Sequence, residues 1–135
     1  METKALYKLA EEENIIVDHI PLPHARAFSL MDEDGDCFVA LDLSQFQSDA
    51  EERVALAHEL GHCMRGAFYN RYSPLDSKSR HERRANVWMY RRLVSEDELH
   101  EAVSMGNVEI WQLAEYFGLP QNIMEAIVCY YEGIE

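Results

Sequence analysis

Apolar positions along the chain form short runs near its start and helical stripes further on. An amphipathic pattern predicts a helix over residues 2–13, and the apolar run at 15–17 begins a short strand. The runs ARAFSLM and DCFVALDL then flank the polar stretch DEDG, which predicts a β-hairpin with its turn at Asp34 and Gly35. The first third of the chain is therefore expected to form one helix and a small antiparallel sheet.

Two long helices are predicted to follow. Ser48 and Glu51 stand three residues apart, which is the spacing of a capping box, and they open a helix over about 49–67. A second helix ends near residue 94, and Ser77 or Ser79 is expected to cap it.

Three shorter helices complete the pattern: one capped by SEDE, one over VEIWQLAEYFGL, and one that Pro120 opens and that ends near Gly133. Strands followed by helices predict an α+β fold. We expect one domain over residues 1–135, with the N-terminal helix and sheet in 1–47, two long helices in 48–94 and C-terminal helices in 95–135.

Composition limits the class of protein. With 47% apolar and 27% charged residues, the 135-residue chain resembles an ordinary soluble globular protein. No apolar run approaches the roughly 20 residues that span a bilayer, and the N-terminus lacks the pattern of a signal peptide. Three cysteines without C-x-x-C spacing argue against a disulfide framework. These features predict a protein of the reducing cytoplasm.

The net charge of −13 is unevenly distributed. Residues 65–92 contain eight Lys and Arg against Asp76 and Glu82, whereas no Lys or Arg follows Arg92 and nine acids do. One interpretation is a set of solvated helix faces that neutralise each other in the fold. The other is a polar molecule with one basic flank and one acidic lobe.

The first long helix contains the stretch ALAHELGHCM, an H-E-x-x-H pattern. His58 and His62 stand one turn apart on the same helix face, so their imidazoles are placed to bind one metal ion. Glu59 is rotated away from that face and is placed to hydrogen-bond a water on the metal. The alternative is a helix whose histidines are satisfied at the surface. Apolar residues surround most of this helix, which favours a buried position, and Gly61 indicates close approach of another backbone.

Zinc at a catalytic site needs a third protein ligand and an open position for water. The candidates downstream are Asp76, His81, Glu82 and His100. Glu82 is favoured because it lies on the stripe of the second long helix that is expected to pack inward, formed by Ala85, Asn86, Met89 and Leu93. His81 is the second choice and points about 100° away. The alternative for Glu82 is an exposed acid in the first helical turn.

The segments ERVALAHELGH and ERRAN, which starts at Glu82, together resemble the ImmA/IrrE-like metallopeptidases. LAEYFGLPQNIMEAIV is similar to that family's C-terminal region, so the resemblance covers roughly residues 25–130. It implies a zincin-like helical core, Zn²⁺ on His58, His62 and Glu82, and Glu59 as the catalytic carboxylate. It also implies that CFVALDL forms one wall of the cleft. The chain departs from the family at VWMYRRLVS, which replaces a more apolar stretch but changes no zinc position.

These parts predict a mechanism. Zinc lowers the pKa of its water toward about 7 and polarises a peptide carbonyl, and Glu59 takes the proton of the water and delivers it to the leaving amine. Asn86, one turn past Glu82, is the candidate for orienting that ligand, although a simple surface role fits equally well. The candidates for stabilising the oxyanion are Tyr69, Tyr72, Tyr90 and His81.

Two functions remain open. The first is a zinc metallopeptidase that cleaves a protein substrate, which the resemblance suggests is a helix-turn-helix repressor of a phage or mobile element. The second is a zinc-containing protein that antagonises such a regulator without cutting it, a role for which Glu59 is not needed. Direct nucleic-acid binding is rejected because LAEYFGLPQNIMEAIV carries no Lys or Arg. The acidic C-terminal lobe is expected to attract a basic partner, and CFVALDL to hold part of it by strand addition.

Overall fold

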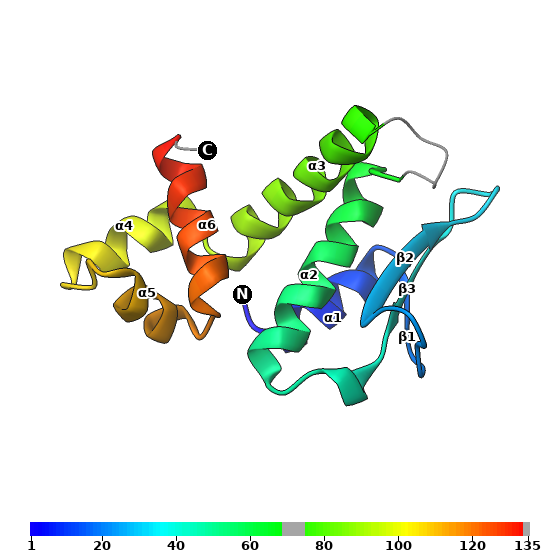
Figure 1. Cartoon of the computed structure of the whole chain (residues 1–135), viewed down its shortest axis with the longest axis horizontal. Coiled ribbons are helices and arrows are strands. Elements are labelled where there is room, and N and C mark those ends of the chain that lie inside the picture. Colours follow the sequence, from blue (N-terminus) through cyan, green and yellow to red (C-terminus); the bar gives the residue numbers. More distant parts are fainter. Residues whose placement is uncertain (69–74, 134–135) are drawn as a thin grey trace.

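The computed structural model of the chain describes residues 1–68 and 75–133 (Figure 1). The sheet and the first two α-helices lie at one end of the molecule, and the last three α-helices lie at the other. The elements in chain order are α1 Thr3–Glu12, β1 Ile16–His19, β2 Ala27–Met31, β3 Cys37–Leu41, the 3₁₀ helix η1 Leu43–Gln45, α2 Asp49–Arg65, α3 Leu75–Leu93, α4 Glu96–Ser104, α5 Ile110–Phe117 and α6 Gln121–Glu132.

The sheet has the strand order β1-β3-β2, and it is mixed rather than wholly antiparallel. The predicted hairpin is confirmed: β2 and β3 are antiparallel, and Gly35 in their turn has a φ of +85°. The sheet was expected to be antiparallel throughout, and this is wrong for β1. That strand pairs with β3 on the side opposite β2, and it runs parallel to β3. Four of the five residues of β3 are buried, so the most apolar strand takes the central position and leaves β2 at an edge.

One face of the sheet packs against α1 and α2 (Figure 1). Because side chains alternate between the two faces of a strand, the paired residues Ser29 and Val39 point to the same side. Val39 is 1% exposed and belongs to the core, so Ser29 also points toward the helices. The strand β2 therefore presents one polar side chain to α2.

The helix α2 begins and ends with local signals. The Ser48 hydroxyl accepts a hydrogen bond from the Glu51 N–H at 3.2 Å, as expected for an N-cap. In a capping box the Glu51 carboxylate would accept from the backbone N–H of Ser48. Here it accepts instead from the N–H of the preceding residue, Gln47, at 2.6 Å. At the other end Gly66 adopts the left-handed conformation, which most residues avoid.

The predicted close approach at Gly61 is confirmed. A Cβ atom added there would lie 2.5 Å from the backbone oxygen of Ala85 on α3. The inward stripe of α3 is also confirmed, since Ala85, Met89 and Leu93 are buried. The start of α3 was predicted wrongly: the helix begins at Leu75, so Ser77 and Ser79 lie inside it and neither is its cap. Serines are tolerated in helices, which makes a lone serine a weak marker of a helix start.

The three C-terminal helices follow the predicted pattern. Ser95 and Glu98 form a complete capping box at the start of α4. Pro120 occupies the N-cap position of α6, and Gly133 ends that helix in the left-handed conformation. Leu99, Leu113, Met124 and Ile127 join these helices to the common core. Among the residues described, no helix has the length and apolar character needed to cross a membrane.

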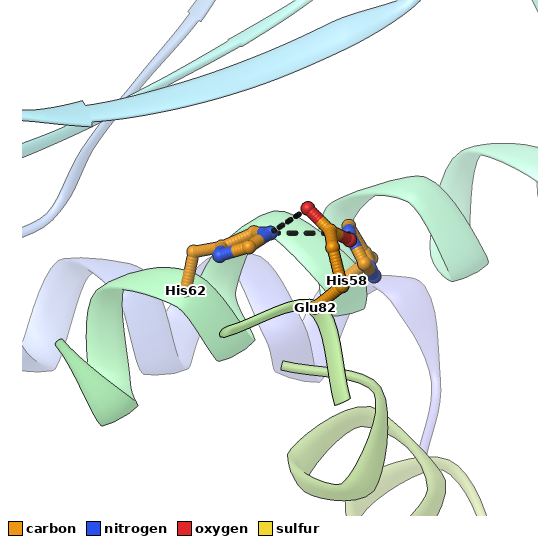
Figure 2. A group of neighbouring side chains, drawn as sticks. All are labelled: His58, His62 and Glu82. Carbon is orange, nitrogen blue, oxygen red and sulfur yellow. Dashed lines mark hydrogen bonds and ion pairs between the residues drawn. The ribbon is translucent and has the colours of Figure 1, made fainter. Parts of the chain in front are cut away.

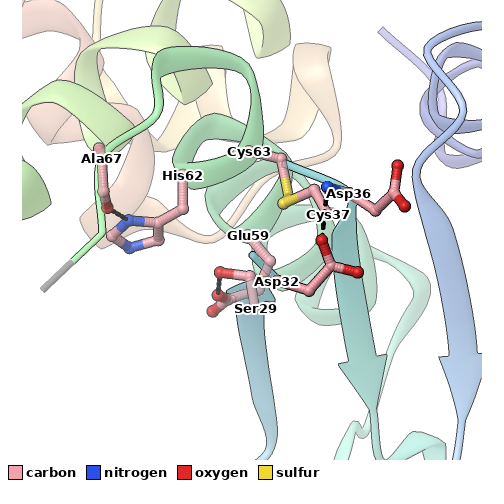
Figure 3. Close-up of a disulfide and its surroundings, with 8 residues drawn as sticks. All are labelled: Ser29, Asp32, Asp36, Cys37, Glu59, His62, Cys63 and Ala67. Atoms are coloured by element: carbon pink, nitrogen blue, oxygen red, sulfur yellow. Dashed lines mark hydrogen bonds between the residues drawn. A yellow bond between two sulfur atoms is a disulfide. The ribbon is translucent and has the colours of Figure 1, made fainter. Parts of the chain in front are cut away.

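A disulfide joins Cys37 at the start of β3 to Cys63 on α2 (Figure 3). The sequence argued against a disulfide framework because its three cysteines are an odd number and lack C-x-x-C spacing, and that prediction was wrong. Packing of α2 on the sheet brings the Cα atoms of Cys37 and Cys63 to 5.9 Å, which lies in the range for a disulfide. Cys129 is free. The argument from cysteine usage for a reducing compartment therefore no longer holds.

Candidate metal site

The two histidines of α2 direct their Nε2 atoms toward the same point. His58 and His62 lie one turn apart, and their Nε2 atoms are 3.2 Å from each other. His62 is 6% exposed, because α2 is buried along this side. Glu82 of α3 completes the group: its carboxylate oxygens lie 3.0 Å from Nε2 of His58 and 3.2 Å from Nε2 of His62 (Figure 2).

The other ring nitrogens determine the protonation of the histidines. Nδ1 of His62 donates to the carbonyl oxygen of Ala67, which has no proton to give (Figure 3). Nδ1 of His58 lies 2.8 Å from the side-chain oxygen of Asn86 and donates to it. In the neutral rings both Nε2 atoms therefore carry lone pairs. Two such nitrogens and a carboxylate facing one another repel unless a cation lies among them.

The distances within the group fit a small metal ion. Four ligands arranged tetrahedrally at about 2.0–2.1 Å from a metal lie roughly 3.3–3.4 Å apart. The measured separations between ligand atoms from different residues are 3.0–3.2 Å. The three residues thus form a compact donor set of two imidazoles and one carboxylate. They leave room for a further ligand on the side that faces the cavity.

The turn after α2 holds His62 through two hydrogen bonds. The left-handed Gly66 reverses the chain, so that the Ala67 N–H donates to the His62 carbonyl at 2.9 Å. The Ala67 carbonyl then accepts from the His62 ring. Ala67 was not among the predicted site residues. Its signal was Gly66, a glycine directly after the last helical residue.

Asn86 supports a different ligand from the one predicted. The sequence placed it one turn past Glu82 as a partner of that carboxylate. In the structure its side-chain oxygen contacts His58 on the neighbouring helix, because α2 and α3 pack closely at Gly61. Asn86 therefore orients an imidazole and fixes its tautomer.

Glu59 lies beside the donor set, as its position in the motif predicts. Its Oε1 atom accepts a hydrogen bond from the Ser29 hydroxyl at 2.7 Å (Figure 3). Sequence reasoning missed Ser29. The available signal was a polar residue on a strand face that is otherwise directed at the core, between Ala27 and Met31. The contact shows that β2 and α2 together hold the carboxylate.

Two cavities flank Glu59. One, of about 330 Å³, contains all three donor residues and is bounded by Phe28 and Phe68. The other, of about 300 Å³, also reaches His58 and Glu59 and continues over an apolar floor formed by Val54, Ala55, Met89 and Ile123. Both cavities are walled by β2, whereas the resemblance implied CFVALDL. Residues 37–41 of that segment form β3, the central strand, which pairs with β2 and lines neither cavity.

The remaining candidates do not join this group. His81 contacts Arg84 at 3.3 Å and lines a separate hollow on the outward side of α3. Tyr90 packs against Tyr130 with ring centroids 5.8 Å apart and lines neither cavity beside Glu59. Burial raises the pKa of the Tyr90 hydroxyl, which therefore stays protonated.

Four candidates remain. His100 is exposed on α4. Tyr69 and Tyr72 lie outside the described residues, as does the side chain of Asp76.

Comparison with known proteins gave one match. The sequence model of the M78 peptidase family, whose domain is described as IrrE N-terminal-like, matches residues 21–126. This range includes β2, α2 and α3, and so every residue of the donor set together with Glu59 and Ser29. No curated protein and no solved structure matches the chain.

Proposed function

The chain belongs to the IrrE N-terminal-like family of M78 peptidases, and on that premise we propose that it is a zinc-dependent metallopeptidase with Glu59 as its general base. The family is one of metallopeptidases, which implies a divalent metal and a protein substrate. The assignment of zinc to His58, His62 and Glu82 is supported by the chemistry of the set. Two imidazoles and a carboxylate are a common ligand combination for catalytic zinc, which leaves a fourth position open.

One observation carries the proposal. The Nε2 lone pairs of His58 and His62 converge with the Glu82 carboxylate, and a second carboxylate, that of Glu59, is held beside them by a different contact. Glu82 belongs to the donor set, whereas Glu59 faces the cavity and is bonded to Ser29. A purely structural metal site needs only the donor set. The presence of Glu59 in the same cavity as the donor set favours catalysis over simple metal binding.

Each residue of the site has a separate role in the proposed hydrolysis of a peptide bond. Bound zinc would supply a Lewis acid that acidifies water and polarises the scissile carbonyl. Glu59 accepts a proton from the attacking water and returns it to the leaving amine. The Ser29 hydroxyl keeps one carboxylate oxygen of Glu59 engaged, which leaves the other oxygen to accept the proton. For the oxyanion donor, Tyr69 and Tyr72 remain the candidates.

The edge strand β2 is the better candidate for holding the substrate. The central β3 pairs on both sides, so the strand addition that the sequence suggested for CFVALDL is not available there. The second edge of β2 has no strand partner among the described residues. We propose that an extended substrate segment adds to that edge, because residues of β2 line both cavities together with Glu59.

The proposed substrate is a DNA-binding regulator of a phage or mobile element, and the acidic lobe α4–α6 is its proposed docking surface. The resemblance noted in the sequence suggests such regulators, and their DNA-facing surfaces are basic. Trp111, Met105 and Val108 are 51%, 63% and 64% exposed on the same lobe, which adds apolar contact area to the charge.

Charge reversal tests this docking. Glu98 and Glu109 are unsuitable positions because both take part in capping boxes. Glu101, Glu115 and Glu125 are exposed and have no such role. Their change to Lys is expected to weaken regulator binding by about tenfold and to reduce its dependence on salt. Binding that ignores both added salt and the reversal would contradict docking through this lobe.

The function itself is tested with the helix-turn-helix regulator encoded nearest to the gene. We expect the purified protein to cleave it, a chelator to abolish cleavage, and added zinc to restore it. A complex that forms with and without chelator while the regulator stays intact would instead support the alternative, a zinc-containing antagonist that does not cut its partner.

A further inference from the structure

A second candidate binding site lies on the outward face of α3. It is a groove of about 520 Å³ whose wall carries five arginines, Arg65, Arg83, Arg84, Arg91 and Arg92, around Val87 and Trp88. At 100° per residue, Arg84 and Arg91 point roughly 180° away from Glu82. The groove is thus separated from the metal site by the thickness of the helix.

Most of the positive charge of this groove has no ion-pair partner among the residues that the structure describes. Four of its arginines, Arg65, Arg84, Arg91 and Arg92, form no ion pair within the described part of the chain. Of the described residues that line the groove, none is acidic. The chain has 25 Asp and Glu and only 12 Lys and Arg, so the chain as a whole does not lack carboxylates that could pair with arginines. Like charges gathered in one groove repel one another, which favours an anionic ligand from outside.

The dimensions favour a short extended segment. The nine helical steps from Arg83 to Arg92 rise about 14 Å, which corresponds to about four residues of extended chain. The half-buried Trp88 lies among the arginines and offers an apolar surface. The guanidinium of Arg92 already covers its ring at 5.3 Å from the centroid. That contact obstructs one face on which a nucleobase would stack.

Long polyanions are disfavoured for a second reason. Glu96, Asp97 and Glu98 begin α4 just beyond the end of α3. A nucleic acid that continued past the groove in this direction would meet these carboxylates. A short acidic segment ends before it reaches them.

We propose that this groove binds a short acidic segment of a partner protein, with an apolar side chain against Trp88 and carboxylates on the arginines. Paired Arg–carboxylate contacts give such recognition both strength and geometry. The site is independent of the peptidase proposal, since no described residue lines both the groove and either cavity beside Glu59.

The test uses the blocked, fluorescein-labelled peptide EEFEE, with QQFQQ and KKFKK as controls. Fluorescence anisotropy is expected to show saturable binding of EEFEE but not of QQFQQ or KKFKK. Added salt should weaken the binding of EEFEE. The double change Arg84→Glu and Arg91→Glu should weaken binding by at least about tenfold. The matched pair Lys4→Glu and Lys8→Glu makes the same change in net charge on α1, and it should alter binding less than about twofold.

Tryptophan fluorescence locates the contact. The chain has two tryptophans, so Trp111→Phe leaves Trp88 as the reporter, and its emission should change on addition of EEFEE. Trp88→Phe leaves Trp111, whose emission should not change. Equal weakening by the two charge-reversal pairs would overturn the proposal, because attraction would then be unspecific.

Two further results would also overturn it. Tighter groove-dependent binding of a five-nucleotide oligothymidylate than of EEFEE would assign the site to nucleic acid. Absence of peptide binding, together with self-association that the Arg84 and Arg91 changes abolish in sedimentation experiments, would assign it to the acidic lobe of a second copy.

Discussion

Hydrogen bonds at the Nδ1 atoms of His58 and His62 determine what the opposite ring nitrogens can do. Each Nδ1 donates to an oxygen, of Asn86 in one case and of Ala67 in the other. Each Nε2 is consequently left with a lone pair directed at Glu82. The two supporting oxygens come from different parts of the chain, α3 and the turn after α2, so both must pack correctly before the donor set exists.

The neighbouring residues Glu82 and His81 provide a matched pair for identifying the third ligand. Glu82→Ala removes a carboxylate that lies 3.0 and 3.2 Å from the imidazoles, and we expect the purified variant to lose most of its zinc. His81→Ala removes a side chain on the outward face of α3 and should retain about one zinc per chain. Elemental analysis of both proteins measures this. Full zinc in the Glu82 variant with loss in the His81 variant would reverse the ligand assignment.

A substitution at Ser29 tests the positioning of Glu59 separately from the binding of the metal. Ser29→Ala deletes the hydrogen bond to Glu59 while leaving every donor residue in place, so zinc content should be unchanged. The turnover number is expected to fall by about tenfold, as for other groups that orient a reacting residue. Ser104→Ala on α4 is the control, since its hydroxyl bonds only its own helix. Zinc loss on Ser29→Ala would mean that the residue supports the fold of the site instead.

At the scale of elements, the contact between α2 and α3 determines whether the ligands from the two helices meet. Ala would normally stabilise a helix interior by about 1 kcal/mol relative to Gly. At position 61, however, its Cβ would lie 2.5 Å from the Ala85 carbonyl oxygen, and such overpacking typically costs about 1–3 kcal/mol. Gly61→Ala is therefore expected to lower the free energy of unfolding in urea and to weaken zinc retention.

A second substitution distinguishes the cause. The atom that blocks the added Cβ belongs to the backbone of Ala85, so Ala85→Gly should not restore stability to the Gly61→Ala protein. Rescue by that change would show that the clash involves the Ala85 side chain, and the close backbone approach would have been misjudged.

The connection between the sheet and α2 depends on Asp42. Its carboxylate accepts hydrogen bonds from the Gln45 side chain, the Leu22 N–H and the Ser44 hydroxyl at 2.9, 3.0 and 2.6 Å. These bonds, that of Gln45 foremost, hold the pKa of Asp42 well below its usual range. A carboxyl whose pKa is lower in the folded state stabilises the fold above its unfolded pKa of about 3.9. That contribution is lost as the pH falls through the folded pKa.

Thermal melts across pH test this contribution. Asp42→Asn is expected to melt below the wild type at pH 7, and the difference should shrink as the pH is lowered from about 4 toward 2. Asp18→Asn, at an exposed position on β1, is the control and should melt like the wild type throughout. A difference between Asp42→Asn and the wild type that stays constant down to pH 2 would contradict the linkage.

At the scale of the whole molecule, the sequence predicted those features that local rules determine. The caps at Ser48 and Ser95, the turn at Gly35 and the inward position of Glu82 follow from spacing within one element or from an apolar stripe. Features that arise between distant segments were missed or mistaken. The parallel pairing of β1, the bond between Cys37 and Cys63, and the contact of Ser29 with Glu59 all require the sheet to be packed on α2 before they can be seen.

The same packing explains why the sequence could group some residues of the site but not identify all of their contacts. His58 and His62 needed only helical periodicity, and Glu82 needed the additional argument that a carboxylate on an inward-facing stripe requires a counter-charge. Asn86 was placed on the correct face of α3, but its partner depends on how closely two helices approach. The unequal charge distribution was also visible in the sequence, whereas its concentration in a groove around Trp88 was not.

The central claim is that Glu59 acts as the base of a zinc peptidase, and Glu59→Gln tests it most directly. This change keeps the shape of the side chain and its contact with Ser29 but removes the proton acceptor. Zinc content and cleavage of the regulator would be measured on the same preparation. We predict about one zinc per chain and cleavage reduced by about 100-fold or more. Undiminished cleavage with zinc bound would contradict the mechanism, and loss of zinc would show that Glu59 supports the metal site.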